Sequence, residues 1–233
     1  MKKYDIVLFD ADETLLDFKR AEREALAATL IDFSFPCSEE IIEVYSKINS
    51  SFWKKLERGE IDKASLKTER FREFCETLGF SCNPVEMAET YIKNLSEQAF
   101  VFEGAEEICK RLSKTCRLYI VTNGIKSVQT KRFDKSGLKP YFENCFISED
   151  MGFEKPDRRY FEAVAAKISD FDASRTLIVG DSLTSDIAGG MNFNIDTCWY
   201  NPNGFFGEGM TYTVSNLFEI EEIVMGEEKS FAE

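Results

Sequence analysis

The sequence contains no histidine among its 233 residues. This absence excludes histidine acid/base catalysis, serine–histidine and cysteine–histidine nucleophile pairs, and imidazole ligands to a metal. Any chemistry of the chain must therefore use carboxylates, lysine, hydroxyl groups and a metal ion that prefers oxygen ligands.

Cysteine pairs and long apolar runs are also missing. The seven cysteines are odd in number and form no C-x-x-C pair, which argues against both a disulfide framework and a thiolate zinc site. We interpret them as small buried hydrophobic residues or inert surface thiols. No window approaches the roughly 18 apolar residues of a membrane span, and the stretch MKKYDIVLFDADE has too few apolar residues for a secretory signal. These features predict a reduced, cytoplasmic setting without membrane attachment.

Positive charge is scarce. Lysine and arginine number 29 against 42 for aspartate and glutamate, which gives a formal net charge of -13. Such a charge disfavours binding to a nucleic-acid polymer or to an anionic membrane. An anionic substrate then needs a local cation, and the length suits one large domain or one domain with a smaller insertion. The oligomeric state stays open.

Short apolar runs alternate with helical patterns over most of the chain. The runs predict strands over residues 4–9, 117–123, 144–150, 176–182 and 196–201. Helical patterns cover residues 104–114, 126–137, 157–168 and 184–192. This alternation predicts an α/β fold with a doubly wound parallel sheet, in which ligands bind at the carboxyl ends of the strands.

Only helical patterns occupy the long stretch between the first two strands. They cover residues 18–33, 38–59, 65–79 and 83–98. Ser38 and Asn83 are placed to cap helix starts, and Gly79 is placed to end a helix. We therefore expect an α/β catalytic core made of residues 1–16 and 97–233, with residues 17–96 forming an inserted helical domain.

Four polar clusters each follow a predicted strand. They are Asp10 with Asp12; Thr122, Asn123 and Gly124; Lys155; and Asp181 with Asp186. Because the carboxyl ends of parallel strands meet at one edge of a sheet, clusters that are far apart in sequence should share one crevice.

The crowding of carboxylates in that crevice predicts a metal ion. Two carboxylates about 4 Å apart repel each other by about 1 kcal/mol in water and by about 4 kcal/mol at an effective dielectric of 20. The crevice would gather Asp10, Asp12, Asp181 and Asp186. A divalent cation relieves this repulsion, and a site that offers only oxygen ligands favours Mg²⁺.

Such a site suits phosphoryl transfer. Asp10 can attack phosphorus to give an aspartyl-phosphate, which divides one hard step into two easier ones. Asp12 can protonate the departing alkoxide and then deprotonate the hydrolytic water. Mg²⁺, Lys155 and Thr122 would balance charge on the phosphoryl oxygens. The expected activity is therefore that of a Mg²⁺-dependent phosphomonoesterase.

The four clusters resemble the signature motifs of the haloacid dehalogenase-like superfamily of hydrolases. DADETL resembles its D-x-D-x-T start, VTNG its Ser/Thr motif, EKPD its lysine motif and GDSLTSD its acidic motif, in the family's order over residues 5 to about 204. The resemblance implies a Rossmann-like core with a helical cap, which closes over the site and limits the substrate to a small phosphorylated metabolite.

The resemblance also implies residue roles. Asp10 would be nucleophile and metal ligand, and Asp12 the general acid/base that also binds metal through its backbone carbonyl. Asp181 would be a metal ligand, and Asp186 would belong to the inner or outer coordination sphere. Thr122, Asn123, Gly124 and Lys155 would bind phosphate. The pair Asp10 and Asp12 resembles the phosphatase branch of the superfamily, because the dehalogenase branch lacks the second aspartate.

One residue departs from the family pattern, and two segments together resemble one subgroup of the family. Glu13 stands where glycine is common, which bears on the geometry of the turn and on the substrate. DADETL together with WYNPNG resembles the house-cleaning 5′-nucleotidases, which act on nucleoside 5′-monophosphates. In the helical insertion, Phe18, Trp53 and Arg72 are candidate contacts to the leaving group, although aromatic residues at helical spacing more often belong to a core.

Other functions remain as alternatives. A calcium loop starting at Asp10 fails, because Leu15 stands where glycine is needed and Ala21 where glutamate is needed. A sugar-phosphate or phosphoglycolate phosphatase and a phosphomutase use the same kind of site. A non-enzymatic phospho-accepting switch also uses aspartates, Thr, Lys and Mg²⁺, but its phosphorylated aspartate normally follows the third strand and no helical block separates its first two strands.

Overall fold

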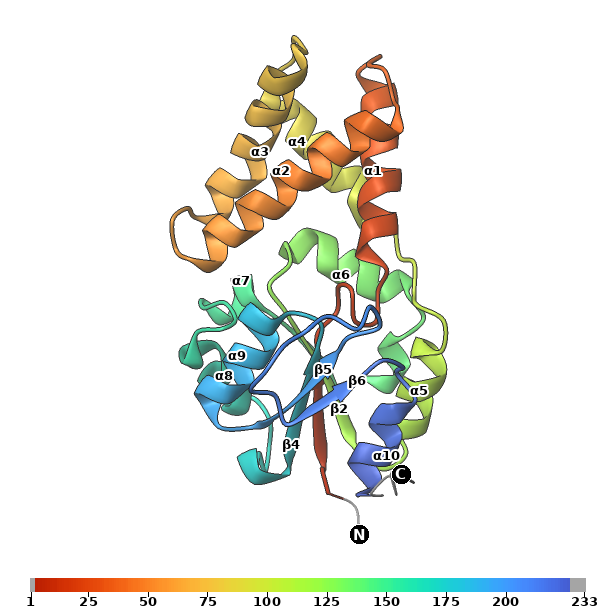
Figure 1. The fold of residues 1–233 in the computed structure, drawn as a ribbon, viewed down its shortest axis with the longest axis vertical. Helices are drawn as coiled ribbons and strands as arrows, with labels where there is room; N and C mark the ends of the chain where they lie inside the picture. Colours follow the sequence, from red (N-terminus) through yellow and green to blue (C-terminus); the bar gives the residue numbers. More distant parts are fainter. Residues whose placement is uncertain (1–2, 227–233) are drawn as a thin grey trace. The chain divides into compact units, whose positions relative to one another are not determined.

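The computed structural model describes residues 3–226, and the chain falls into two compact units. The core unit consists of the residues up to Asp17 together with those from Val101 onward, and the helical unit is Phe18–Phe100 (Figure 1). Within residues 3–226, no helix is both long and apolar enough to cross a membrane.

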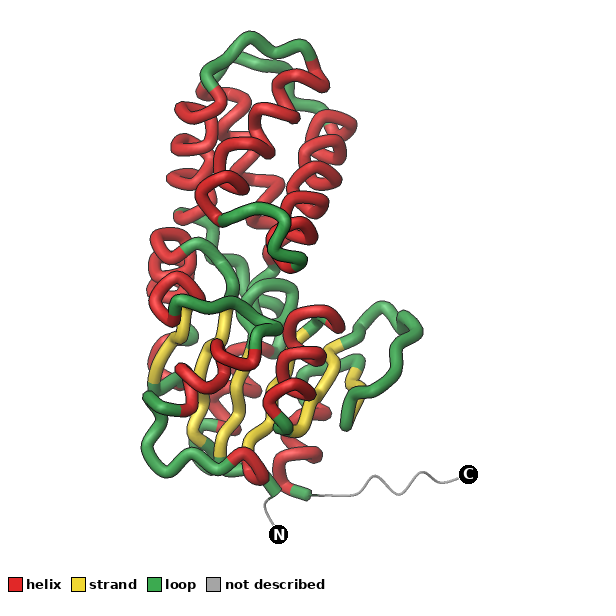
Figure 2. Tube along the Cα trace, turned by 90° about the vertical axis from the view of Figure 1, so that its left-hand side faces the viewer, coloured by secondary structure: helices red, strands yellow, loops and turns green. Residues whose placement is uncertain are grey.

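The core unit contains one six-stranded sheet in which every neighbouring pair is parallel. Its spatial order is β3-β2-β1-β4-β5-β6, and helices lie on both sides of it (Figure 2). The strands are β1 (Ile6–Phe9), β2 (Arg117–Thr122), β3 (Asn144–Ile147), β4 (Thr176–Gly180), β5 (Asp196–Tyr200) and β6 (Tyr212–Val214). The predicted doubly wound α/β fold is therefore confirmed.

Six α-helices and three helical segments of other types complete the described part of the core unit. The α-helices are α5 (Ala105–Leu112), α6 (Lys126–Lys135), α7 (Ser148–Met151), α8 (Arg158–Ala165), α9 (Ala188–Phe193) and α10 (Glu219–Met225). The other segments are the 3-10 helices η1 (Lys139–Tyr141) and η2 (Ala173–Arg175) and the π-helical turn η3 (Leu183–Ile187).

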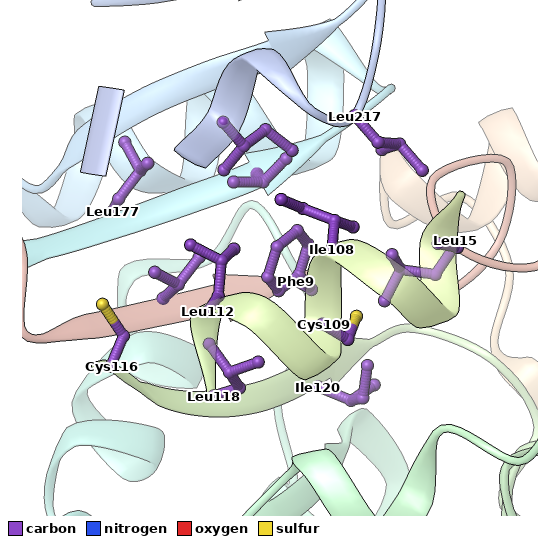
Figure 3. Close-up of a cluster of buried hydrophobic side chains, with 14 of the residues drawn as sticks. Phe9, Leu15, Ile108, Cys109, Leu112, Cys116, Leu118, Ile120, Leu177 and Leu217 are labelled. Carbon is purple, nitrogen blue, oxygen red and sulfur yellow. The ribbon is translucent and has the colours of Figure 1, made fainter. Parts of the chain in front are cut away.

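Strand β1 contributes side chains to the hydrophobic cores on both faces of the sheet. Val7 and Phe9 belong to one core, together with side chains of α5 and α10. Figure 3 shows Phe9 beside Ile108 and Cys109 of α5. Ile6 and Leu8 point into the other core, which α8 covers. Because successive strand residues face opposite sides, a strand buried on both faces must be apolar throughout. Each fully buried side chain of this kind contributes about 1.5 to 3 kcal/mol.

Three local expectations were wrong. Residues 148–150 were expected to extend the third strand, but they begin α7. The single helix expected over 184–192 is a π-helical turn followed by α9. The sequence reading also missed β6 and α10, which are short.

The helical unit contains four helices at the positions expected from sequence. They are α1 (Phe18–Asp32), α2 (Glu39–Glu57), α3 (Lys63–Leu78) and α4 (Pro84–Ser96). The Asn83 side chain accepts a hydrogen bond from the Val85 amide at 3.0 Å, as its capping position predicts. Gly79 ends α3 with a φ of 68°. Ser38 occupies the N-cap position of α2 without a side-chain cap hydrogen bond.

One cysteine pair corrects the interpretation of the cysteines as unpaired residues. Cys75 in the last turn of α3 and Cys82 in the loop before α4 form a disulfide. The chain reverses at Gly79, which brings the two residues together although they are seven positions apart. The other five cysteines, all within residues 3–226, form no disulfide.

A buried polar chain links three helices of the helical unit. Glu22 on α1 accepts hydrogen bonds from Ser46 at 2.7 Å and from the Asn49 amide at 2.6 Å, both on α2. The Asn49 carbonyl oxygen accepts a bond from Arg70 Nη1 on α3 at 2.6 Å. Glu22, Asn49 and Arg70 are each at most 5% exposed. An asparagine amide therefore bridges a buried anion and a buried cation.

Replacing Arg70 with methionine should lower the free energy of unfolding of the helical unit by about 2 to 4 kcal/mol, because Glu22 then stays buried without its compensating cation. The protein has two tryptophans, Trp53 and Trp199. Urea unfolding of a Trp199→Phe background, followed through Trp53 fluorescence, measures the effect. Arg72→Met is the matched control on the same helix, since Arg72 is exposed and forms a surface ion pair with Glu69 at 2.9 Å. Equal stability of the two variants contradicts the prediction.

Candidate active site

The polar clusters lie where the strand order changes direction on either side of β1. Asp10 directly follows β1, and its backbone amide donates to the Val179 carbonyl of β4 at 2.8 Å. Thr122 is the last residue of β2, and Asp181 directly follows β4. Because β1 lies between β2 and β4, these residues meet at one edge of the sheet, where open α/β sheets bind ligands.

Three carboxylates gather there around a buried lysine. One oxygen each of Asp10, Asp181 and Asp186 lies within 4.8 Å of the others. Lys155 Nζ donates to Asp10 Oδ1 at 2.6 Å, to Asp186 Oδ1 at 2.7 Å and to the Val121 carbonyl at 2.7 Å. Lys155 is 2% exposed, so all three donor positions of its ammonium group serve this site.

The electrostatics of the cluster show a surplus of negative charge. Burial, and then the charges of Asp186 and Asp181, raise the pKa of Asp10 well above its usual range, although Lys155 opposes this. Burial, followed by the charges of Asp186 and Glu13, raises the pKa of Asp181 to about 7. Burial favours a lower pKa for Lys155, but Asp10 and Asp186 outweigh it and raise the pKa. One lysine therefore does not neutralise three carboxylates.

Tight local packing fixes Asp186. A Cβ at Gly180 would lie 2.2 Å from Asp186 Oδ2, so only glycine fits at the end of β4. The same oxygen accepts a hydrogen bond from the Ser182 amide at 3.1 Å. Asp186 itself lies in the π-helical turn η3, a kind of segment that is frequent at functional sites.

Asn123 holds the backbone of Lys155. Its side-chain amide donates to the Lys155 carbonyl at 2.8 Å, and its side-chain oxygen accepts from the Lys155 amide at 2.9 Å. This two-way contact joins the loop after β2 to the loop that carries the lysine. Phosphate binding by Asn123 stays a prediction; in the structure its side chain holds the backbone of Lys155.

Asp12 contacts two buried residues that the sequence motifs did not include, and one of them, Gln129, links it to Thr122. Asp12 accepts hydrogen bonds from Arg132 Nη1 and, at 2.9 Å, from Gln129 Nε2. Gln129 Nε2 also lies 2.9 Å from Thr122 Oγ1. The Asp12 carboxylate is therefore not part of the group of carboxylates formed by Asp10, Asp181 and Asp186.

Glu13 has the backbone conformation of a glycine. Its φ is 60°, in the left-handed region that glycine occupies without strain. This explains why glycine is common at the corresponding position of the family pattern. The turn keeps its geometry with glutamate, and the Glu13 charge contributes to the raised pKa of Asp181.

The three candidates for leaving-group contacts lie in the helical unit. Phe18 begins α1 and is half-buried, and Trp53 is half-buried on α2. Arg72 is exposed on α3 and pairs with Glu69 at 2.9 Å.

Comparisons with known proteins agree with the geometry of the core. The model of a family described as haloacid dehalogenase-like hydrolase matches residues 4–194. The chain is 39% identical to the pyrimidine 5′-nucleotidase PynA of Streptococcus pneumoniae over 201 residues, which cover 86% of this chain and 85% of PynA. It is 32% identical to the pyrimidine 5′-nucleotidase YjjG of Escherichia coli over 228 residues, which cover 95% of this chain and 98% of YjjG.

A solved structure extends the likeness to three dimensions. The crystal structure of the HAD-hydrolase YfnB from Bacillus subtilis, bound to magnesium, superposes with a TM-score of 0.91 at 37% identity. The match covers 96% of this chain and 99% of YfnB.

Proposed function

The chain belongs to the haloacid dehalogenase-like hydrolase family, and from this premise we propose that it is a Mg²⁺-dependent phosphomonoesterase acting on pyrimidine nucleoside 5′-monophosphates. The observation that carries the proposal is the buried Asp10 carboxylate, which contacts Lys155 at 2.6 Å. Asp12, two residues further on, supplies the second carboxyl group that a phosphatase needs. The two pyrimidine 5′-nucleotidases at 39% and 32% identity support the substrate class.

The carboxylate cluster fits a Mg²⁺ ion. Asp10, Asp181 and Asp186 each offer an oxygen to one point, and their combined charge exceeds that of Lys155. Mg²⁺ prefers such hard oxygen ligands. When bound, the ion would neutralise negative charge on the phosphoryl group.

The protein's own residues account for both chemical steps. An Asp10 carboxylate oxygen forms a bond to phosphorus while the ester P–O bond breaks, and Asp12 gives its proton to the departing oxygen. In the second step Asp12 takes a proton from water, the water oxygen bonds to phosphorus, and the bond between Asp10 and phosphorus breaks to release phosphate. The Thr122 hydroxyl donates to a phosphoryl oxygen, and the positive charge of Lys155, held beside Asp10 by its three hydrogen bonds, balances the charge of the phosphoryl group. We further propose that the helical unit is the family's cap domain.

A substrate panel tests this function. Phosphate release should be measured with UMP, CMP, AMP, GMP and a sugar phosphate, each with Mg²⁺ or with EDTA. We expect release that requires Mg²⁺ and is fastest for UMP and CMP. A preference for the sugar phosphate would move the protein to the alternative substrate class, and no release from any ester would contradict the proposed function.

The apparent affinity for Mg²⁺ should fall as the pH drops below about 7. Burial and the neighbouring charges raise the pKa of Asp181 to about 7, so Asp181 carries a proton at pH 6 and has lost it at pH 8. A carboxyl group must lose its proton to bind a metal, so the proton competes with Mg²⁺ at the lower pH. We expect the Kd from calorimetry to be about tenfold higher at pH 6 than at pH 8.

A variant of Glu13 provides the matched control for this pH dependence. The Glu13 charge helps to raise the pKa of Asp181, so Glu13→Gln should shift the change in affinity to lower pH. A Kd that does not vary between pH 6 and pH 8 would contradict the role of Asp181 as a ligand.

A further inference from the structure

Helix α6 carries two buried polar residues outside the four sequence motifs. Gln129 and Arg132 are separated by three positions, so they lie on the same face of the helix. They are 3% and 0% exposed. A buried guanidinium group is costly unless it is paired and hydrogen-bonded, so the contacts of Arg132 indicate why the residue is there.

Both residues contact the carboxylate of Asp12. Arg132 Nη1 donates to Asp12 Oδ1, and Gln129 Nε2 donates to Asp12 Oδ2 at 2.9 Å. The two residues also bond to each other, because Arg132 Nη1 donates to Gln129 Oε1 at 3.0 Å. Each carboxylate oxygen therefore has a fixed donor, and the orientation of the carboxylate is set by α6.

Gln129 also defines the direction of the hydrogen bonds at Thr122. The Thr122 oxygen accepts from Gln129 Nε2 at 2.9 Å and from the Gly124 amide at 3.1 Å. A hydroxyl group has two acceptor lone pairs and one proton. Since both lone pairs are used, the hydroxyl can still only donate, which is what a phosphoryl oxygen requires.

The glycine of the VTNG segment supports this arrangement. A Cβ at Gly124 would lie 2.4 Å from Cγ and 2.8 Å from Nε2 of Gln129. The Gln129 side chain therefore occupies the space that any other residue at position 124 would need. The loop after β2 is shaped to admit Gln129 between Thr122 and Asp12.

We propose that Gln129 and Arg132 are positioning residues that hold Asp12 in place for proton transfer to the leaving group. The inference rests on the proposed phosphomonoesterase function and deepens it. It differs from a purely structural role, in which the buried pair would only stabilise the core.

Esters with different leaving groups separate these two roles. A nucleoside 5′-monophosphate releases an alkoxide, which needs a proton from Asp12, whereas p-nitrophenyl phosphate releases a stable phenolate, which does not. The ratio kcat/KM reports on the steps up to release of this group. It should be measured on CMP or UMP and on p-nitrophenyl phosphate for the wild type, Gln129→Leu, Arg132→Met and Arg132→Lys.

We expect selective losses. Gln129→Leu and Arg132→Met should lower kcat/KM on the nucleotide by about 10- to 100-fold, with KM for the nucleotide almost unchanged. The loss of kcat/KM on p-nitrophenyl phosphate should be at least tenfold smaller than the loss on the nucleotide. Arg132→Lys keeps the buried charge without the planar fork and should recover part of the activity. Thr130→Ala, on the exposed face of α6, is the matched control and should resemble the wild type.

The outcomes distinguish the inference from the function on which it rests. Equal losses on both esters would overturn the positioning role and leave the phosphomonoesterase in place. No release of phosphate by the wild type from either ester would overturn both. Retained activity on p-nitrophenyl phosphate shows that a variant is folded, and if Arg132→Met does not fold, Arg132→Lys provides the same comparison.

Discussion

Replacing Asp10 with asparagine is expected to lower phosphate release by about 10⁴-fold or more, because an amide cannot form the bond to phosphorus. The substitution keeps the size of the side chain and an oxygen that can accept the hydrogen bond from Lys155. Burial already raises the pKa of Asp10, so the charged form is unfavourable there and its loss should not unfold the protein. Steady-state kinetics on the best ester of the panel, with a thermal melt of the same sample, measure both effects.

Asp134→Asn is the control for this substitution. Asp134 forms a surface ion pair with Lys139 at 2.6 Å and lies on the exposed side of α6. Its replacement should leave turnover within about twofold of the wild type, since surface pairs contribute little. Similar rates for Asp10→Asn and Asp134→Asn would contradict the assignment of Asp10 as the nucleophile.

Lys155→Met is expected to lower the free energy of unfolding of the core unit by about 3 to 5 kcal/mol at pH 8 in EDTA, besides abolishing activity. Lys155 Nζ donates to Asp10, to Asp186 and to the Val121 carbonyl, and methionine leaves all three acceptors buried without this donor. Trp199, whose indole nitrogen donates to the Asp181 carbonyl at 2.8 Å, reports on this region in a Trp53→Phe background. Urea unfolding gives the difference.

The loss caused by Lys155→Met should shrink at lower pH. The pKa values of Asp10 and Asp181 are raised above those of the unfolded chain, so between about pH 4 and pH 7 the native state binds more protons than the unfolded state. Stability therefore rises as the pH falls through that range, and the unpaired carboxylates are neutralised. The destabilisation should be smaller at pH 5.5 than at pH 8.

Lys167→Met is the matched control for Lys155→Met, because Lys167 is exposed beyond the end of α8. It should leave stability unchanged at both pH values. A Lys155→Met protein that is as stable as Lys167→Met at pH 8 would contradict the view that Lys155 compensates the carboxylate cluster.

The parts of the fold and site that could be predicted from sequence share one physical origin. Parallel strands in the centre of a sheet must be apolar throughout, and a polar residue directly after such a strand lies at the edge where ligands bind. Asp10, Thr122 and Asp181 could be predicted on this basis. The order of the four motifs indicated the family, which the family model and the relatives confirm.

Gln129 and Arg132 could not be predicted in this way. Both lie inside a helix, where polar residues usually face solvent, and nothing in the pattern of α6 shows that this face is buried against Asp12. Gly124 marks the place, but its meaning shows only in the structure: its φ is not positive, so the glycine has a packing reason instead of a conformational one. The distances show that reason to be the Gln129 side chain.

Helix α7 was missed for a related reason. Its four residues follow β3 directly, without a turn residue between the two elements, and a helix of one turn has little propensity of its own. Contacts with α6 hold it, since Glu149 accepts from the Lys126 amide at 3.2 Å and Asp150 pairs with the Lys126 side chain. Tertiary contacts of this kind are not visible in the local sequence.

The most direct test of the account is to find the phosphoryl group on the protein. The wild type, Asp10→Asn and Asp12→Asn should each be mixed with Mg²⁺ and p-nitrophenyl phosphate, whose leaving group needs no proton from Asp12. The samples should be quenched in acid and their peptides analysed by mass spectrometry. We expect a phosphoryl group on Asp10 that accumulates in Asp12→Asn, because hydrolysis of the intermediate then lacks its base. Asp10→Asn should carry no phosphoryl group at this position. Turnover of p-nitrophenyl phosphate by the wild type with no phosphoryl group on Asp10 in either the wild type or Asp12→Asn would contradict the role of Asp10 as the nucleophile.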